Sequence, residues 1–335
     1  MTGSGIEERK LALGFAAGSS GALQWDWARE PDFGMQRSDG SAKVWESMMR
    51  ELGEFATQAA PYATGITFPD VAVVLPQSLQ MSTRNGQAVQ AQQTAVRVLY
   101  QEDRVEAYAV GEYQIDTLGK PKLILLPSPF GLTDAAWAAI EARVRDGAVL
   151  LISGPFSEDE HMHATDRAQK LGLDATLVPL QLRDELLHSP AGDLSLEYGG
   201  TATTVLDRSR MADGKEFVEL PLGKGKVLFS VFPLELNGDT ASIARVYEYA
   251  IKAAGVSRTY TTSVANPGIL ICPTRMPHAT LYVLTSETET TTVSFTDTQS
   301  GKLFSGRLEA GRAALLLVGE HGDLIARYRW RDGGE

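Results

Sequence analysis

The middle of the chain alternates short runs of hydrophobic residues with helical patterns. Three runs contain almost only Val, Leu, Ile and Ala, as expected for strands covered on both faces: 71–75, 123–126 and 149–152. A helical pattern at about 87–100 follows the first run, and another short strand is expected at 105–110. Such alternation is typical of βαβ units. We therefore expect residues 66–258 to form an α/β domain with a mainly parallel sheet flanked by helices.

Helix boundaries within this domain are marked by particular residues. Thr133 is expected to cap the start of a helix with one apolar face, and Gly147 is expected to end it. From about 194 to 231 the pattern changes to shorter strands with Gly and Asp turns, and 223–231 returns to the sheet. A last helix at 242–254 closes the domain.

The residues before this domain predict two helices and one strand. We expect a helix at 6–19, a strand at 21–27, a loop at 28–43 and an amphipathic helix at 44–60. Ser41 is the expected N-cap of the second helix, and Pro61 is expected to end it. A lone strand with two helices cannot cover its own apolar face. We therefore expect the unit at 21–60 either to self-associate or to dock onto another chain.

The last region, residues 259–335, is rich in Thr and Val and predicts an all-β module. Strands are expected at 280–284, 291–295 and 313–318, with Asp and Gly residues at the turns between them. This length is enough for a small β-sandwich-like domain.

Several motifs carry a resemblance to a known family. GALQWDW at 21–27, with GMQRSDGSAK at 34–43, looks like the last strand of a (β/α)₈ barrel and the loop into its last helix. Four further motifs resemble a β-galactosidase trimerisation domain: PKLILLPSPF at 121–130, RDGAVLLISG at 145–154, GKGKV at 223–227 and AAGV at 253–256. In layout the chain resembles the C-terminal half of family 42 glycoside hydrolases and related clan A enzymes.

The resemblance implies a function for each region. Residues 1–65 would be a remnant of the last β/α units of a barrel, although a complete barrel needs about 250 residues. Residues 66–258 would be a flavodoxin-like trimerisation-type domain, a fold similar to class I glutamine amidotransferases. Residues 259–335 would be the small β domain that follows it.

The expected function is non-catalytic, because the family's two catalytic glutamates lie on barrel strands that would precede this segment. Retaining hydrolysis needs two carboxyl groups about 5–5.5 Å apart, and no residue here inherits either role. We therefore expect an accessory and oligomerisation part of a glycoside-hydrolase-like protein in carbohydrate metabolism. The alternative is a β-galactosidase-type hydrolase that is active only when upstream sequence or a partner chain supplies the missing barrel. The expected partner is a second copy of the chain or a chain that carries the rest of the barrel.

Substrate-binding residues are expected only in a completed barrel. Trp25, Trp27 and Arg29 would lie where the top-face loop begins, and either tryptophan would then stack on a sugar. The same tryptophans equally suit core or interface packing, which is the commoner role of buried aromatic residues. Asp26 and Glu30 form a carboxylate pair in the sequence, but without a pocket that raises one pKa they are not a catalytic site.

Other candidate chemistry is better explained by structural roles. Cys272 lies in an apolar strand outside the α/β domain, so we interpret it as a small buried residue and not as a nucleophile. The run EDEHMH at 158–163 has His-x-His spacing, but a zinc site needs further convergent ligands, and a solvated polar loop is favoured. GKGK at 223–226 is too short for a phosphate loop and predicts a turn. We expect no cofactor and no metal.

Charge and composition limit the partners further. The formal net charge is −11, and no basic stripe is present, which argues against nucleic acid and against an anionic membrane surface. The single cysteine excludes an internal disulfide, and no stretch reads as a signal peptide or a membrane span. The sequence therefore predicts a cytoplasmic protein.

Overall fold

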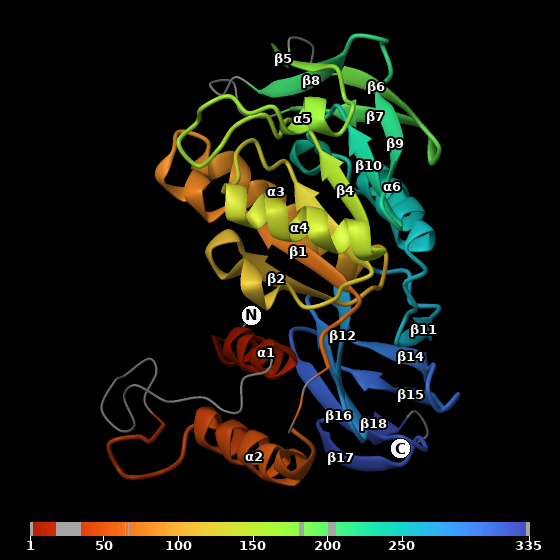
Figure 1. Cartoon of the computed structure of the whole chain (residues 1–335). Helices are drawn as coiled ribbons and strands as arrows, with labels where there is room; N and C mark the ends of the chain where they lie inside the picture. The colour runs from red at the N-terminus through yellow and green to blue at the C-terminus, as the bar shows by residue number, and fades with distance from the viewer. Residues whose placement is uncertain are drawn as a thin grey trace. The chain divides into compact units, whose positions relative to one another are not determined.

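The computed structural model describes residues 3–17, 35–63, 65, 67–180, 184–199 and 206–332. The chain divides into two compact units (Figure 1). Unit 2 contains residues 68–257, and unit 1 combines residues 1–67 with 258–335. None of the helices in the described residues is both long and apolar enough to cross a lipid bilayer.

Unit 2 is built on a six-stranded sheet with the order β2-β1-β3-β4-β10-β9. Five strands are parallel, and β9 is antiparallel to β10. The strands are β1 (Val71–Leu75), β2 (Ala107–Gly111), β3 (Leu123–Pro127), β4 (Val149–Ser153), β9 (Phe217–Leu222) and β10 (Gly225–Ser230). The parallel strands follow the 2-1-3-4-5 order of flavodoxin-like sheets. The predicted α/β fold with a mainly parallel sheet is confirmed.

Three long helices cover this sheet: α3 (Asn85–Gln101), α4 (Asp134–Asp146) and α6 (Thr240–Ala253). The β1-to-β2 and β3-to-β4 crossovers run in opposite directions along the sheet, so right-handed connections place α3 and α4 on opposite faces. Helix α6 packs against α3. The Thr133 hydroxyl accepts a hydrogen bond from the Ala136 amide, which confirms the predicted cap of α4. Gly147, with a φ of 128°, follows its last turn as expected.

Short elements fill the connections of unit 2. Two small antiparallel pairs lie between β4 and β9. One strand of each pair falls in the region from about 194 to 231 where the sequence predicts short strands, and the other strand of each pair precedes that region. These pairs are β5 (Ala175–Pro179) with β8 (Asp207–Met211), and β6 (Asp184–Ser189) with β7 (Gly192–Glu197). The remaining short helices are η2 (Gln77–Met81), η3 (Glu112–Leu118), α5 (Arg167–Lys170) and η4 (Leu234–Leu236).

Unit 1 contains two four-stranded antiparallel sheets, with the orders β11-β14-β15-β18 and β12-β13-β16-β17. Their strands are β11 (Tyr260–Thr262), β12 (Ile269–Met276), β13 (Ala279–Ser286), β14 (Thr291–Asp297), β15 (Leu303–Leu308), β16 (Ala313–Gly319), β17 (Leu324–Tyr328) and β18 (Arg331–Asp332). One aromatic core joins the sheets. In it Phe295 contacts Tyr282, Phe304 and Trp330. Two sheets that share one core are typical of a sandwich.

The N-terminal helices belong to the same unit as these sheets. Helix α1 (Gly3–Ala16) packs on β12, β13 and β16, and α2 (Val44–Ala59) packs on β17. A short 3₁₀ turn, η1 (Ala60–Tyr62), follows α2 and contains Pro61. Because α1 covers its outer face, β13 is buried along its whole length.

Met48, Leu52 and Phe55 of α2 are at most 3% exposed, so these residues of its apolar face are covered within the chain. The partner expected for the N-terminal segment stays a prediction. One expectation for this segment was wrong. Ser41 is not the N-cap. Lys43 occupies that position without a side-chain cap bond, and Ser41 instead donates to Asp39. The predicted strand at 21–27 lies outside the described residues, so the barrel remnant stays a prediction.

Candidate functional site at the carboxyl edge of the parallel sheet

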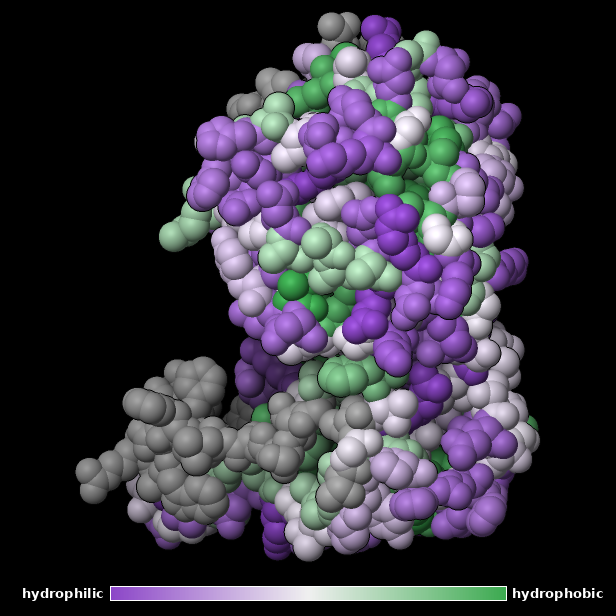
Figure 2. Space-filling view, viewed as in Figure 1, coloured by the Kyte–Doolittle hydropathy of each residue, from purple (hydrophilic) through white to green (hydrophobic). Residues whose placement is uncertain are grey.

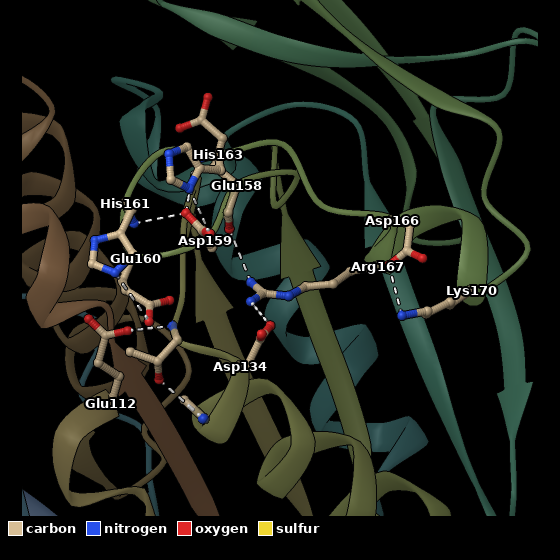
Figure 3. A network of polar contacts seen from close by, with 12 residues as sticks. Glu112, Asp134, Glu158, Asp159, Glu160, His161, His163, Asp166, Arg167 and Lys170 are labelled. Atoms are coloured by element: carbon tan, nitrogen blue, oxygen red, sulfur yellow. Dashed lines mark hydrogen bonds and ion pairs between the residues drawn. The ribbon is translucent and has the colours of Figure 1, made fainter.

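Ligands of open α/β sheets bind beyond the carboxyl ends of the parallel strands. In unit 2 this edge is formed by the segments that follow β1, β2, β3, β4 and β10. Polar side chains from all five segments meet there, and Figure 3 shows part of the resulting network.

A completely buried carboxyl group, that of Glu235, occupies one end of this edge. Its Oε2 accepts hydrogen bonds from the hydroxyl groups of Ser128 (3.1 Å) and Ser153, and its Oε1 accepts one from Tyr247 (2.7 Å). Burial raises the pKa of Glu235, and the bonds from Ser153 and Tyr247 oppose that shift. The carboxyl group thus joins the ends of β3 and β4 to η4 and α6.

A second buried acid, Glu112, connects the other end of the edge. It lies at the start of η3, directly after β2. One carboxyl oxygen accepts from the backbone amide of Ser78, and the other accepts from the amide of Thr133 at 2.9 Å. Glu112 therefore holds together the segments after β1, β2 and β3. Both of its carboxyl oxygens thus accept hydrogen bonds from backbone amides of the protein itself.

Arg84 bridges the loops above this edge. Its guanidinium lies 3.0 Å from Oδ2 of Asp207 and 3.6 Å from Oε1 of Glu158, and it stacks 4.4 Å from the ring centroid of Phe130. Phe130 adopts a positive φ of 47°. A strained conformation of this kind persists only where the surroundings hold it in place, and the stacked arginine is part of those surroundings.

Arg167 connects the loop after β4 to the start of α4. It is only 4% exposed, and it donates to the carboxylate of Asp134 (2.6 Å) and to the carbonyl of Glu158 (3.0 Å), as Figure 3 shows. Gly131 lies so close under this loop that a Cβ atom there would be 2.7 Å from the carbonyl oxygen of Asp159. The loops after β3 and β4 are thus in direct contact.

The His-x-His run lies at the exposed tip of the same loop. Asp159 accepts hydrogen bonds from the backbone amides of His163 and His161, both at 2.8 Å, and the His163 bond contributes most to lowering the pKa of Asp159. The two imidazole rings are 5.9 Å apart and exposed to solvent. Across the described residues, no three His, Cys, Asp or Glu side chains converge as metal ligands. The geometry is that of a polar turn organised by Asp159.

The other residues singled out in the sequence lie elsewhere. Trp25, Trp27 and Arg29 lie outside the described residues, as do Asp26 and Glu30. Cys272 is buried in β12 of unit 1. The first two residues of the GKGK run form the turn between β9 and β10, and the last two begin β10. Gly223, in the turn, has a φ of 61°.

Sequence reasoning missed the residues that organise this edge: Arg84, Glu112, Arg167 and Glu235. Glu235 offered a signal, because it lies between two leucines just after a buried strand, where a charged residue is unusual. Glu112 also follows a strand directly. Arg84 and Arg167 carry no local signal, since their partners are distant in the sequence.

The chain resembles solved glycoside hydrolases in fold. No family model and no curated protein matches its sequence. Gan42B, a GH42 β-galactosidase from G. stearothermophilus, has a TM-score of 0.68 at 13% identity over 93% of this chain and 50% of that one. The β-galactosidase from Bacillus circulans sp. alkalophilus has a TM-score of 0.68 at 12% identity, over 94% and 52%. The α-L-fucosidase isoenzyme 2 from Paenibacillus thiaminolyticus has a TM-score of 0.60 at 13% identity, over 94% of this chain and 55% of that one.

These matches cover nearly all of this chain but only about half the length of each enzyme. At identities of 12–13% the likeness concerns the fold. The resemblance seen in the sequence is therefore confirmed at that level: the chain has a fold that is shared with about half of a GH42 β-galactosidase.

Proposed function

We propose that this chain is a non-catalytic accessory and oligomerisation part of a glycoside-hydrolase-like protein. The observation that carries the proposal is the shared fold with half of a β-galactosidase chain. The carboxyl edge of unit 2 supports it, because Glu112 and Glu235 are buried and bonded to the protein itself. An acid that holds the scaffold together is not available to protonate a substrate.

The proposal includes self-association, for which helix α4 offers a suitable face. Its exposed positions include three small residues, Ala135, Ala138 and Ala142, and Figure 2 shows pale green over this helix. Small side chains allow a second helix to approach closely. Asp134 begins α4 and Arg145 lies in its last turn. Two copies packed antiparallel through α4 would bring each aspartate near the other copy's arginine, as an isologous interface requires.

Light scattering after gel filtration tests this part of the proposal. We expect the chain to elute as a dimer or larger assembly, and Ala138→Arg to shift it toward the monomer, because a long charged side chain would occupy the centre of the contact. Gln90→Arg adds the same charge at an exposed position on α3 and should leave the assembly unchanged. A monomer at every concentration, or equal behaviour of the two variants, would refute self-association through α4.

The second candidate function is hydrolysis of β-galactosides by a longer protein or complex in which a barrel completes the site. It is favoured by the neighbours themselves, since the chains that share this fold are enzymes about twice as long. Under this alternative, Trp25, Trp27 and Arg29 would contact the sugar. Assays of the chain alone and of any longer reading frame separate the two functions. The cytoplasmic location also remains a prediction.

A further inference from the structure

A positively charged pocket lies in unit 1, far in the sequence from the edge described above. It has a volume of about 260 Å³ and is formed by α2, β15, the start of β16 and β18. Six charged residues line it: Arg307, Arg312, Arg329, Arg331, Glu51 and Glu309. Four guanidinium groups face the two lining carboxylates and a third carboxylate behind them, that of Glu8, which leaves an excess of one positive charge in a protein whose net charge is −11.

A buried acid behind the pocket positions two of these arginines. Glu8 of α1 is completely buried, and its carboxylate lies 2.7 Å from Nε of Arg312 and 3.4 Å from Nε of Arg329. Tyr328 donates a further hydrogen bond to Glu8 at 3.1 Å. Glu8 meets both arginines at their Nε atoms, and Nε of Arg329 also lies 3.5 Å from the carboxylate of Glu51. Side chains held in this way need little ordering when an anion binds.

The other two arginines face each other without compensation. Arg307 of β15 and Arg331 of β18 are directly paired in the antiparallel register. Like charges at such positions destabilise a sheet. Within the described part of unit 1, neither guanidinium forms an ion pair. An anion bound between the two guanidinium groups would attract both of them and so offset their mutual repulsion.

The chemistry of the pocket selects the class of anion. The planar guanidinium group binds phosphate and carboxylate oxygens in pairs. A cluster of four guanidinium groups suits a phosphate monoester better than a single carboxylate, because the monoester offers three acceptor oxygens and carries nearly two negative charges at neutral pH. The volume is slightly below the roughly 300 Å³ at which pockets for larger ligands begin. We propose that this pocket binds a small phosphorylated molecule through its phosphate group, with Arg307, Arg331 and Arg312 as the main contacts.

Isothermal titration calorimetry on the whole chain tests the proposal with four probes: inorganic phosphate, glucose 6-phosphate, glucose and succinate. We expect both phosphates to bind and glucose not to bind. Succinate should bind more weakly than either phosphate, because its charges are split between two distant groups. Tighter binding of succinate, or no heat with either phosphate, would overturn the assignment.

Variants locate the binding in the pocket. Arg307→Ala and Arg331→Ala remove exposed side chains and should each weaken phosphate binding about tenfold, as expected for loss of a charged hydrogen bond. Arg97→Ala removes the same charge from an exposed site on α3 and should leave the dissociation constant unchanged. If all three variants bind phosphate like the parent chain, the site is not this pocket.

Discussion

The phenol of Tyr247 donates a 2.7 Å hydrogen bond to the carboxyl group of Glu235, and both side chains are completely buried. Tyr247 lies on α6, and Glu235 lies in the turn after β10. Ser128 and Ser153 complete the cluster from the ends of β3 and β4. The cluster thus connects a helix and three parallel strands through one carboxyl group.

Removing this carboxyl group should destabilise the fold strongly. Glu235→Ala leaves three buried hydroxyl groups without their acceptor, and each unsatisfied group costs about 1–3 kcal/mol. We expect a loss of about 3 kcal/mol in the free energy of unfolding, measured by urea denaturation. Glu235→Gln keeps one acceptor oxygen and should lose about half as much. A value for Glu235→Ala within 0.5 kcal/mol of the parent, a typical surface effect, would contradict the role of this cluster.

The raised pKa of Glu235 predicts a pH dependence of stability. An unperturbed glutamate titrates near 4.5, and burial raises the pKa of Glu235 above that value. Between the two values the folded protein holds a proton that the unfolded chain has lost, so the contribution of Glu235 to stability falls as pH rises. The melting-temperature advantage of the parent over Glu235→Gln should therefore be largest near the ordinary carboxyl pKa and shrink toward neutral pH. A difference that is constant across this range would argue against a raised pKa.

Gly223 and Gly214 allow a matched test of backbone packing. Both have a positive φ, 61° and 77°. A Cβ atom on Gly223 would lie 2.6 Å from the backbone of Arg145, whereas one on Gly214 would meet nothing within 4 Å. Gly214→Ala should cost about 1 kcal/mol, from backbone strain alone. Gly223→Ala should cost about 3 kcal/mol, because the clash must also be relieved. Equal melting temperatures for the two variants would contradict this prediction, because they would show that the turn between β9 and β10 accommodates the Cβ atom without loss of stability.

Zinc should not stabilise the loop that carries His161 and His163. Both imidazoles are exposed, and Asp159 bonds to the backbone of the same turn. We expect the same melting temperature with a slight excess of zinc and with EDTA, and the same result for His163→Ala. A metal that bound the folded state would raise the parent's melting temperature by mass action, and a rise that His163→Ala abolishes would establish a site here.

Much of the fold follows from local sequence. The runs that become β1, β3 and β4 are apolar at nearly every position, as expected for strands of a sheet covered on both faces. Thr133 lies at the start of α4 and Gly147 at its end, as predicted. Helix caps can be predicted from local sequence because a capping residue bonds to backbone groups only a few residues away.

Most of the omissions concern contacts between distant segments. The apolar face of α2 is covered by β17, which lies more than 250 residues later, and no local pattern reveals such a contact. The arginine pocket was missed for the same reason, since Arg307 and Arg331 become neighbours only through the register of β15 and β18. The error at Ser41 is local: Asp39 and Arg37 bind its hydroxyl group in the turn before α2, so it does not cap the helix.

The most direct test of the account is a hydrolysis assay on the purified chain. An active glycosidase needs an acid and a second carboxylate held across one bond, and the proposed function assigns neither to these residues. With a panel of aryl glycosides that includes the β-galactoside, the account predicts release of the aryl group at the rate of buffer alone. Turnover that co-purifies with the folded chain, and is lost when the chain is unfolded, would contradict it.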